Sequence, residues 1–168
     1  MNGTHVSPDL GDTVYVANVI RAGEEEDYGV ASPVYQVLQG RVLDPRTEGG
    51  FVLFTAPVEG REVRLAAAPE RCWSSPGNAG REAYRASLAD ERVRRQDLEE
   101  FPAIAHRNAW SPAEAEIAKM RAVDNIKTIE TARAALFADL QQKYGIQQEA
   151  IEEPVIAPKR HRLGFGLS

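Results

Sequence analysis

The 168-residue chain has only one cysteine, Cys72, and three histidines. A single cysteine cannot form an intrachain disulfide, which favours a reducing, intracellular setting. The histidines lie far apart in the sequence, and no spacing resembles a zinc site. Cys72 stands next to Trp73 at the end of an apolar segment, which is typical of a small core residue rather than of a nucleophile. We therefore predict no metal site and no catalytic cysteine.

Long apolar runs are also missing, and none approaches the roughly 20 residues of a membrane span. The first residues have neither a basic start nor an apolar stretch, so we predict no signal peptide and a cytoplasmic location, or the virion for a phage-derived protein. The glycines lack the contexts of phosphate-binding loops. Neighbouring carboxylates lie in strongly charged segments, where a raised catalytic pKa is not expected. We predict a protein that is not an enzyme and takes no cofactor.

The net charge of −5 is unevenly distributed. Residues 1–78 hold 6 Lys and Arg against 11 Asp and Glu, whereas residues 79–168 hold 14 of each. The acidic excess therefore belongs to the first part of the chain. This distribution argues against a role for that part in following a nucleic-acid phosphate backbone.

The first part of the chain contains short segments rich in β-branched and aromatic residues, separated by turn residues. They predict strands over 13–20, 34–43, 51–55 and 62–65 and a brief strand at Cys72-Trp73, with Gly40 marking a bulge or bend. Short strands with tight turns favour a small SH3-like β-barrel; an OB-like barrel and an open curled sheet are the alternatives. The predicted core comprises Val14, Val16, Val37, Val42, Phe51, Leu53, Val63 and Leu65.

The second part predicts helices. A charged helix over 81–100 should stop before Pro102, and Ser111-Pro112-Ala113-Glu114 has the sequence of a capping box. The helix that starts there should end at Gly145. Seven of its residues form one stripe, which Arg133 interrupts: Ala118, Ala122, Ile126, Ile129, Leu136, Leu140 and Tyr144. Three further apolar residues fall outside that stripe: Ile117, Met120 and Val123.

These patterns predict an α+β protein in four segments. An N-terminal extension covers 1–11, the small β-barrel 12–76, a two-helix region forming a helical hairpin 77–145, and an extended C-terminal arm 146–168. The arm contains two prolines and no helical periodicity. Apolar residues in an extended segment are typical of an arm that binds in a groove of a neighbouring protein or adds to the edge of its sheet.

A helix with apolar residues on two faces needs two neighbours, and the second can be another chain. The candidate partner-binding residues are Ile117, Met120 and Val123 on the helix and Val155, Ile156 and Phe165 in the arm. A basic group in the arm supplies weaker candidates for nucleic-acid contact: Lys159, Arg160 and Arg162, together with Trp110. Trp110 can alternatively pack on the start of its own helix.

The stretch Asn108-Ala109-Trp110-Ser111, in a helical part that follows a Gly-Asp-Thr-Val barrel start, resembles the CarD-type RNA-polymerase-binding regulators. The resemblance implies a barrel that binds polymerase and a tryptophan, here Trp110, that enters the DNA minor groove. That family's basic helical surface has no counterpart here, because residues 79–168 carry no net charge.

The size, the Ala- and Arg-rich composition and the terminal arm are similar to those of compact barrel-plus-helix proteins of bacteriophages. We therefore interpret the chain as a non-enzymatic interaction or assembly protein. It is expected to act within a homo-oligomer or a larger complex, with a bacteriophage structural or accessory protein as one form of this role. The alternative is a transcription-associated module that binds RNA polymerase or DNA.

Overall fold

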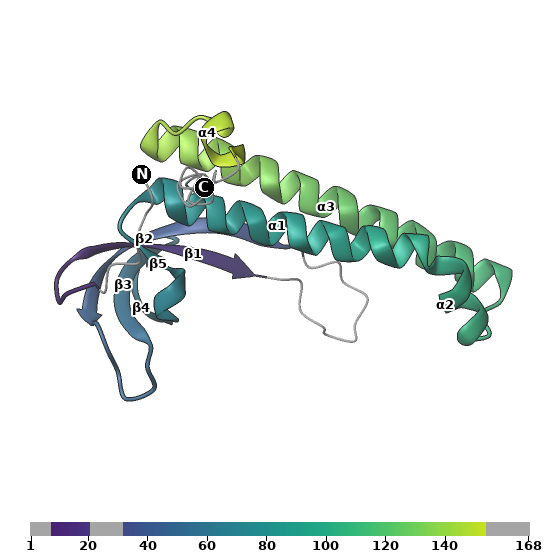
Figure 1. The fold of residues 1–168 in the computed structure, drawn as a ribbon, viewed down its shortest axis with the longest axis horizontal. Helices are drawn as coiled ribbons and strands as arrows, with labels where there is room; N and C mark the ends of the chain where they lie inside the picture. The colour runs from purple at the N-terminus through teal and green to yellow at the C-terminus, as the bar shows by residue number, and fades with distance from the viewer. Residues whose placement is uncertain (1–7, 21–31, 154–168) are drawn as a thin grey trace, which may run out of the picture.

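The computed structural model describes residues 8–20 and 32–153. They form a mixed α+β structure in which a five-stranded antiparallel sheet is followed by helices (Figure 1). The strands are β1 Thr13–Ile20, β2 Val34–Asp44, β3 Val52–Val58, β4 Arg61–Ala67 and β5 Cys72–Trp73, with a 3-10 turn η1 at Pro69–Arg71. The helices are α1 Pro76–Glu99, α2 Phe101–Arg107, α3 Pro112–Tyr144 and α4 Gln148–Glu152.

The sheet is open. Its strand order is β4-β3-β2-β1-β5, so β4 and β5 form the two edges and do not pair with each other. The expectation of a closed barrel is therefore not confirmed, and the arrangement corresponds to the open-sheet alternative. One cluster of buried residues nevertheless draws on β1, β2, β3 and β5, and Leu65 and Ala67 of β4 pack against it. The sheet therefore curves around an apolar core of its own.

The second face of the sheet is covered by helices. In β1, Val16 belongs to the core inside the curved sheet, whereas the adjacent Ala17 belongs to a second cluster shared with α1, α3 and α4. This alternation follows from the two-residue period of a strand. Two hydrogen bonds join sheet aromatics to carboxylates of α1: Tyr35 Oη donates to Asp90 at 2.7 Å, and Trp73 Nε1 donates to Glu82.

The predicted barrel core is correct for Val14, Val16 and Val42, which are buried inside the curved sheet, and wrong for Phe51. Val37 is buried too, but on the other face of the sheet, in the cluster shared with the helices. Leu53, Val63 and Leu65 are half-buried. Phe51 precedes β3 and is 49% exposed, whereas its neighbours Val52 and Phe54 are buried. The pairing of β3 with β2, which places Phe54 opposite Val42, selects the even-numbered residues of β3 for the core.

Gly40 is explained by close packing rather than by the predicted bulge. A side chain at Gly40 would meet the carbonyl oxygen of Thr55, and would lie 2.6 Å from the Phe54 ring. The irregularity in pairing occurs further along β2, between Val42 and Asp44. Gly40 is therefore needed so that β3 can approach β2 at this point.

Both long helices have the end signals that the sequence indicates. Ser111 Oγ accepts from Glu114 N at 3.2 Å, and Glu114 Oε2 accepts from Ser111 N at 2.8 Å, which confirms the capping box. Gly145 ends α3 in the left-handed conformation, with φ 65°. Helix α1 begins earlier than predicted, at Pro76, and ends at Glu99 before Pro102. Pro102 itself lies in the first turn of the additional helix α2, where a missing N–H is tolerated.

Helices α1 and α3 form a hairpin in which α1 contributes small side chains to the contact. Ala79, Gly80, Ala83 and Ser87 are the buried residues of α1. A side chain at Gly80 would lie 2.7 Å from Leu140 Cδ1 of α3 and 3.1 Å from Ile151 Cδ1 of α4. The predicted extended arm is thus wrong for Gln148–Glu152, which form α4, and residues 154–168 lie outside the described chain.

Replacement of Phe54 and of Phe51 tests the register of β3. Phe54→Ala should reduce the free energy of unfolding by about 3–5 kcal/mol, since it empties a fully buried site. Phe51→Ala should cost about 1 kcal/mol or less, because half of that side chain is already in water. Urea denaturation of the two variants measures both values. A larger loss from Phe51→Ala would contradict the register described here.

Gly80 and Gly77 form a matched pair for the helix contact. Gly80→Ala should destabilise the protein by about 1–3 kcal/mol, because the new methyl group overlaps Leu140 and Ile151. Gly77 lies one turn earlier in α1, and a methyl group added there would have no neighbouring atom within 4 Å. Gly77→Ala should therefore cost nothing or stabilise by up to about 1 kcal/mol. Thermal unfolding compares the pair, and equal effects would contradict close packing at Gly80.

Candidate protein-interaction surface

The far end of the hairpin lies beyond the sheet. Helices α1 and α3 run side by side, the sheet underlies one end of them, and α2 closes the other end (Figure 1). The buried residues of α3 are Ile126, Ile129, Leu136 and Leu140, so burial begins only at the fifteenth of its 33 residues. The turns of α3 before Ile126, which we call its uncovered half, are therefore the part that the sheet leaves uncovered.

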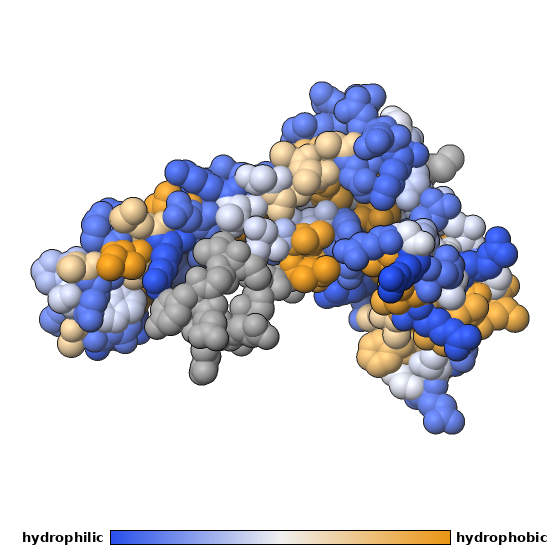
Figure 2. All heavy atoms as spheres, turned by 180° about the vertical axis from the view of Figure 1, so that it is seen from behind, coloured by the Kyte–Doolittle hydropathy of each residue, from blue (hydrophilic) through white to orange (hydrophobic). Residues whose placement is uncertain are grey.

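Ile117 and Met120 are exposed on this uncovered half, by 52% and 59%. Ile117 precedes Ile126 by nine residues, so at about 100° per residue the two side chains point about 180° apart. We call the outward face of α3 around Ile117 and Met120 the distal surface. Figure 2 shows orange apolar atoms among blue polar ones at this end of the molecule. Val123, the third helical candidate, is half-buried and contributes less to this face.

The corner between α2 and α3 holds Trp110. Its ring lies 5.9 Å from the Phe101 ring at 45°, and its backbone N donates to Ala105 O at 3.1 Å. Ala109 precedes it with φ 51°, a left-handed conformation that turns the chain from α2 into α3. The indole is half-buried. The ring that Trp110 contacts is that of Phe101 in α2, and the predicted packing of Trp110 on the start of its own helix stays a prediction.

A polar network fixes how α1 lies against α3. Arg133 donates from Nε to Ser87 Oγ at 2.8 Å, from Nη2 to the carbonyl O of Ser87 at 3.3 Å, and from Nη1 to Glu91 Oε1 at 3.1 Å. Arg95 joins Glu91 to Glu130, at 3.1 and 3.3 Å. Arg133, which interrupts the apolar stripe of α3, therefore links the two helices, and its side chain is only 15% exposed.

The charge of Glu91 depends on this network. Partial burial on its own would raise the pKa of the Glu91 carboxyl, but hydrogen bonds from Arg95 and Arg133 and their positive charges outweigh it, so the pKa lies below its ordinary value. The carboxylate form is therefore favoured by folding. Glu91 pairs with Arg95 one turn later in the same helix, and Arg94 contacts Asp97 at 3.6 Å.

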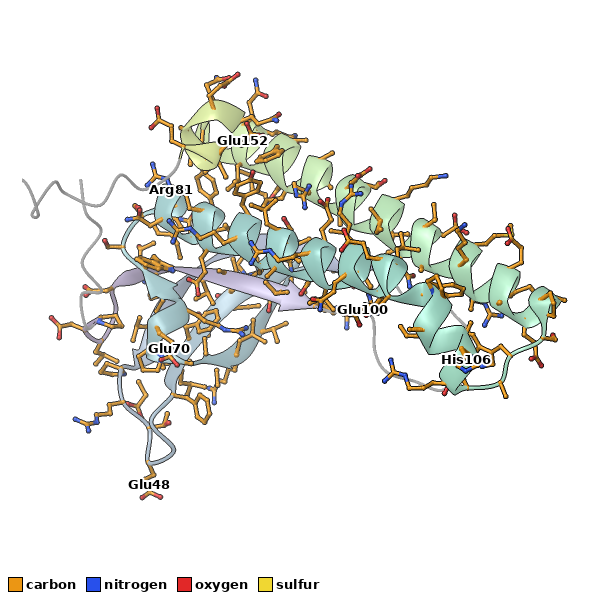
Figure 3. All side chains as sticks on the ribbon, turned by 45° about the vertical axis from the view of Figure 1, so that its right-hand side comes forward. Glu48, Glu70, Arg81, Glu100, His106 and Glu152 are labelled. Carbon is orange, nitrogen blue, oxygen red and sulfur yellow. The ribbon has the colours of Figure 1, made fainter. Side chains whose placement is uncertain are left out.

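The chemistry expected of Cys72 agrees with its surroundings. The thiol is buried, and burial together with the negative charges of Glu82 and Glu70 raises its pKa to about 11. At neutral pH it is a thiol rather than the nucleophilic thiolate. Within 8–20 and 32–153, no group of three or more His, Cys, Asp or Glu residues is placed to hold a metal ion. Figure 3 shows His106 at the far end of the hairpin and Glu70 in the turn η1 beside the sheet, well separated.

The remaining candidates lie outside the described chain. They are Val155, Ile156 and Phe165 as partner contacts and Lys159, Arg160 and Arg162 as nucleic-acid contacts. The segment that carries them follows α4, which is held on α1 by a hydrogen bond from Arg81 Nε to Ala150 O at 3.1 Å. Figure 3 shows Arg81 and Glu152 together at the end of the hairpin opposite His106.

Sequence reasoning missed several exposed apolar residues. Leu10 is 71% exposed before β1, Val93 is 55% exposed on α1, and Ile20 and Val34 are exposed at paired ends of β1 and β2. The position of Leu10 next to the turn residue Gly11 was a usable signal for exposure. Val93 lies between charged residues on its helix, Glu91-Arg92 before it and Arg94-Arg95 after it.

Comparison with known proteins finds no matching protein-family model, no similar curated protein and no similar solved structure. Among the helices of the described residues, none is long and apolar enough to cross a membrane.

The shifted pKa of Glu91 predicts a pH-dependent contribution to stability. Because the folded pKa lies below the unfolded value of about 4.3, the ionised carboxylate stabilises the fold above that pH, and the contribution is lost as the pH falls through the folded pKa. Glu91→Gln should therefore be less stable than the native chain at neutral pH, and the difference should vanish in acid.

Urea denaturation from neutral to acidic pH measures this difference. Glu99→Gln, at an exposed position near the end of the same helix, is the matched control. A constant difference between the native chain and Glu91→Gln at all pH values would contradict an electrostatic origin.

Proposed function

We propose that the protein is a non-enzymatic interaction protein that assembles within a homo-oligomer or a larger complex. The observation that supports this most is the exposure of Ile117 and Met120, three residues apart on a part of α3 that the sheet does not cover. Apolar side chains gathered on an exposed face mark protein-binding sites, whereas scattered ones need no explanation.

The helix backbone beneath the distal surface is held in place by contacts at three points. The capping box fixes the start of α3, the Phe101–Trp110 contact fixes the corner before it, and the Arg133 network fixes α1 against α3. A partner that binds here meets side chains whose backbone is already ordered, so little conformational entropy is lost on binding. This favours binding through a preformed helix face.

The arm supplies a second contact in this proposal, through Val155, Ile156 and Phe165. It is joined to α4, at the end of the hairpin opposite the distal surface (Figure 3). A surface on α3 and a separate segment that follows α4 suit a protein that links neighbours in an assembly, because both contacts can be made at once with different subunits. A bacteriophage structural or accessory protein, in the cytoplasm or the virion, is one such component.

We further propose that the sheet is an SH3-like module whose edge strands stay apart. Support comes from the strand order β4-β3-β2-β1-β5, from the 3-10 turn that precedes β5, and from the core to which β4 and β5 both contribute. In this proposal, the covering helices take the place of full closure on the other face.

The alternative function, a transcription-associated module binding RNA polymerase or DNA, has less support. A tryptophan that enters the minor groove must be free to leave its packing, and Trp110 contacts Phe101. The helical half of the chain has no net charge, because its 14 Lys and Arg are matched by 14 Asp and Glu, so it offers no excess of positive charge to bind phosphates. A mobility shift with duplex DNA at low salt distinguishes the two, since the assembly proposal expects no shift.

Substitutions on the distal surface test the proposed function. The tagged full chain, purified from its source cells, should elute as a stoichiometric complex with itself or another protein, and light scattering gives the mass. The double variant Ile117→Ser/Met120→Ser should weaken this complex by about tenfold or more, because burial of each apolar side chain contributes about 1.5–3 kcal/mol.

Two controls accompany this test. Val93→Ser changes an exposed apolar residue on α1 and should leave the complex intact. A chain ending at Glu153 removes the arm and keeps α4, whose Ile151 is buried. If the full chain is a monomer and no protein co-purifies in stoichiometric amount, the proposed function is wrong.

A further inference from the structure

We propose that the partner on the distal surface is a second copy of this chain, packed with its α3 antiparallel to the first across Ile117 and Met120. This inference rests on the proposed function and specifies the partner. It is carried by the order of apolar and charged residues along one face of α3.

The outward face of α3 has the spacing of a helix–helix contact. Ala113, Ile117, Met120 and Asp124 are separated by four, three and four residues, and all four are exposed. At about 100° per residue they lie within one narrow stripe, roughly opposite the residues that face α1. A partner helix can therefore lie along this stripe without disturbing the hairpin.

A two-fold axis midway between Ala118 and Lys119 makes this stripe complementary to itself. In the antiparallel arrangement, Ile117 of one chain lies opposite Met120 of the other, and the same contact occurs again by symmetry. Ala113 likewise lies opposite Asp124, which leaves room for the larger side chain. The two apolar residues of each copy thus meet at the centre of the contact.

The charges along α3 favour the antiparallel orientation. Before the midpoint, the helix carries Glu114 and Glu116 and no basic residue. Between the midpoint and residue 127, it carries three basic residues and one acidic residue, Asp124. The basic residues are Lys119, Arg121 and Lys127. Antiparallel packing places the acidic part of one copy beside the basic part of the other, whereas parallel packing would place like charges together.

The position of the surface allows such a contact. The uncovered half of α3 extends past the sheet, so a second helix does not meet the strands (Figure 1). The apolar centre is small, with two side chains from each copy, so the dimer should depend on concentration and weaken as salt screens the charges.

Disulfide trapping tests both the partner and its orientation. In a Cys72→Ala background, which removes the native thiol, Ile117→Cys and Met120→Cys chains are prepared separately with tags of different mass. Under mild oxidation, their equimolar mixture should give several-fold more cross-linked heterodimer than either variant gives homodimer. The reason is that position 117 faces position 120 of the other copy.

Val93→Cys in the same background measures random cross-linking, because it is equally exposed on α1. Yields from the two single variants that equal the yield from the mixture would overturn the antiparallel register. Yields no higher than that of Val93→Cys would overturn the second copy as partner. In that case a different protein that co-purifies with the native chain, and is lost with Ile117→Ser/Met120→Ser, would leave the proposed function standing.

Discussion

The close approach of α1 to α3 is the constraint on which the rest of the structure depends. The buried side of α1 consists of small residues, and Gly80 leaves so little room that a methyl group would overlap Leu140 and Ile151. Small side chains let two backbones approach, so the larger residues of α3 and α4 fill the space between them. The same proximity lets Arg133 reach both the hydroxyl and the carbonyl oxygen of Ser87.

The sheet achieves burial on both faces without closing. Neighbouring residues of β1 alternate between the core inside the curved sheet and the core beneath the helices. A closed barrel would need β4 and β5 to pair; here α1, α3 and α4 cover one face instead. Hydrogen bonds from Tyr35 and Trp73 to α1 carboxylates satisfy the polar ends of aromatic residues at this boundary.

The length of α3 explains why a surface is left over. Its 33 residues extend about 50 Å at 1.5 Å per residue, and its buried residues begin only at Ile126. The preceding turns are held by the capping box and by the contact of Trp110 with Phe101 rather than by the sheet. Among residues 8–20 and 32–153, nothing buries Ile117 and Met120, and the proposed contact between molecules would account for their apolar character.

Local signals in the sequence determined the strands, the capping box at Ser111, the end of α3 at Gly145 and the inward stripe of α3, because each depends on a few adjacent residues or on one helix period. They also separated Ile117 and Met120 from that stripe. Tertiary structure alone decided which alternate residues of β3 are buried, since Phe51-Val52-Leu53-Phe54 is apolar in either register and only pairing with β2 chooses between them. Tertiary structure also decided the role of Arg133, which links α3 to α1 instead of merely interrupting the apolar stripe. The partners of Arg133, Ser87 and Glu91, lie more than 40 residues away in the chain, so no local sequence pattern connects them.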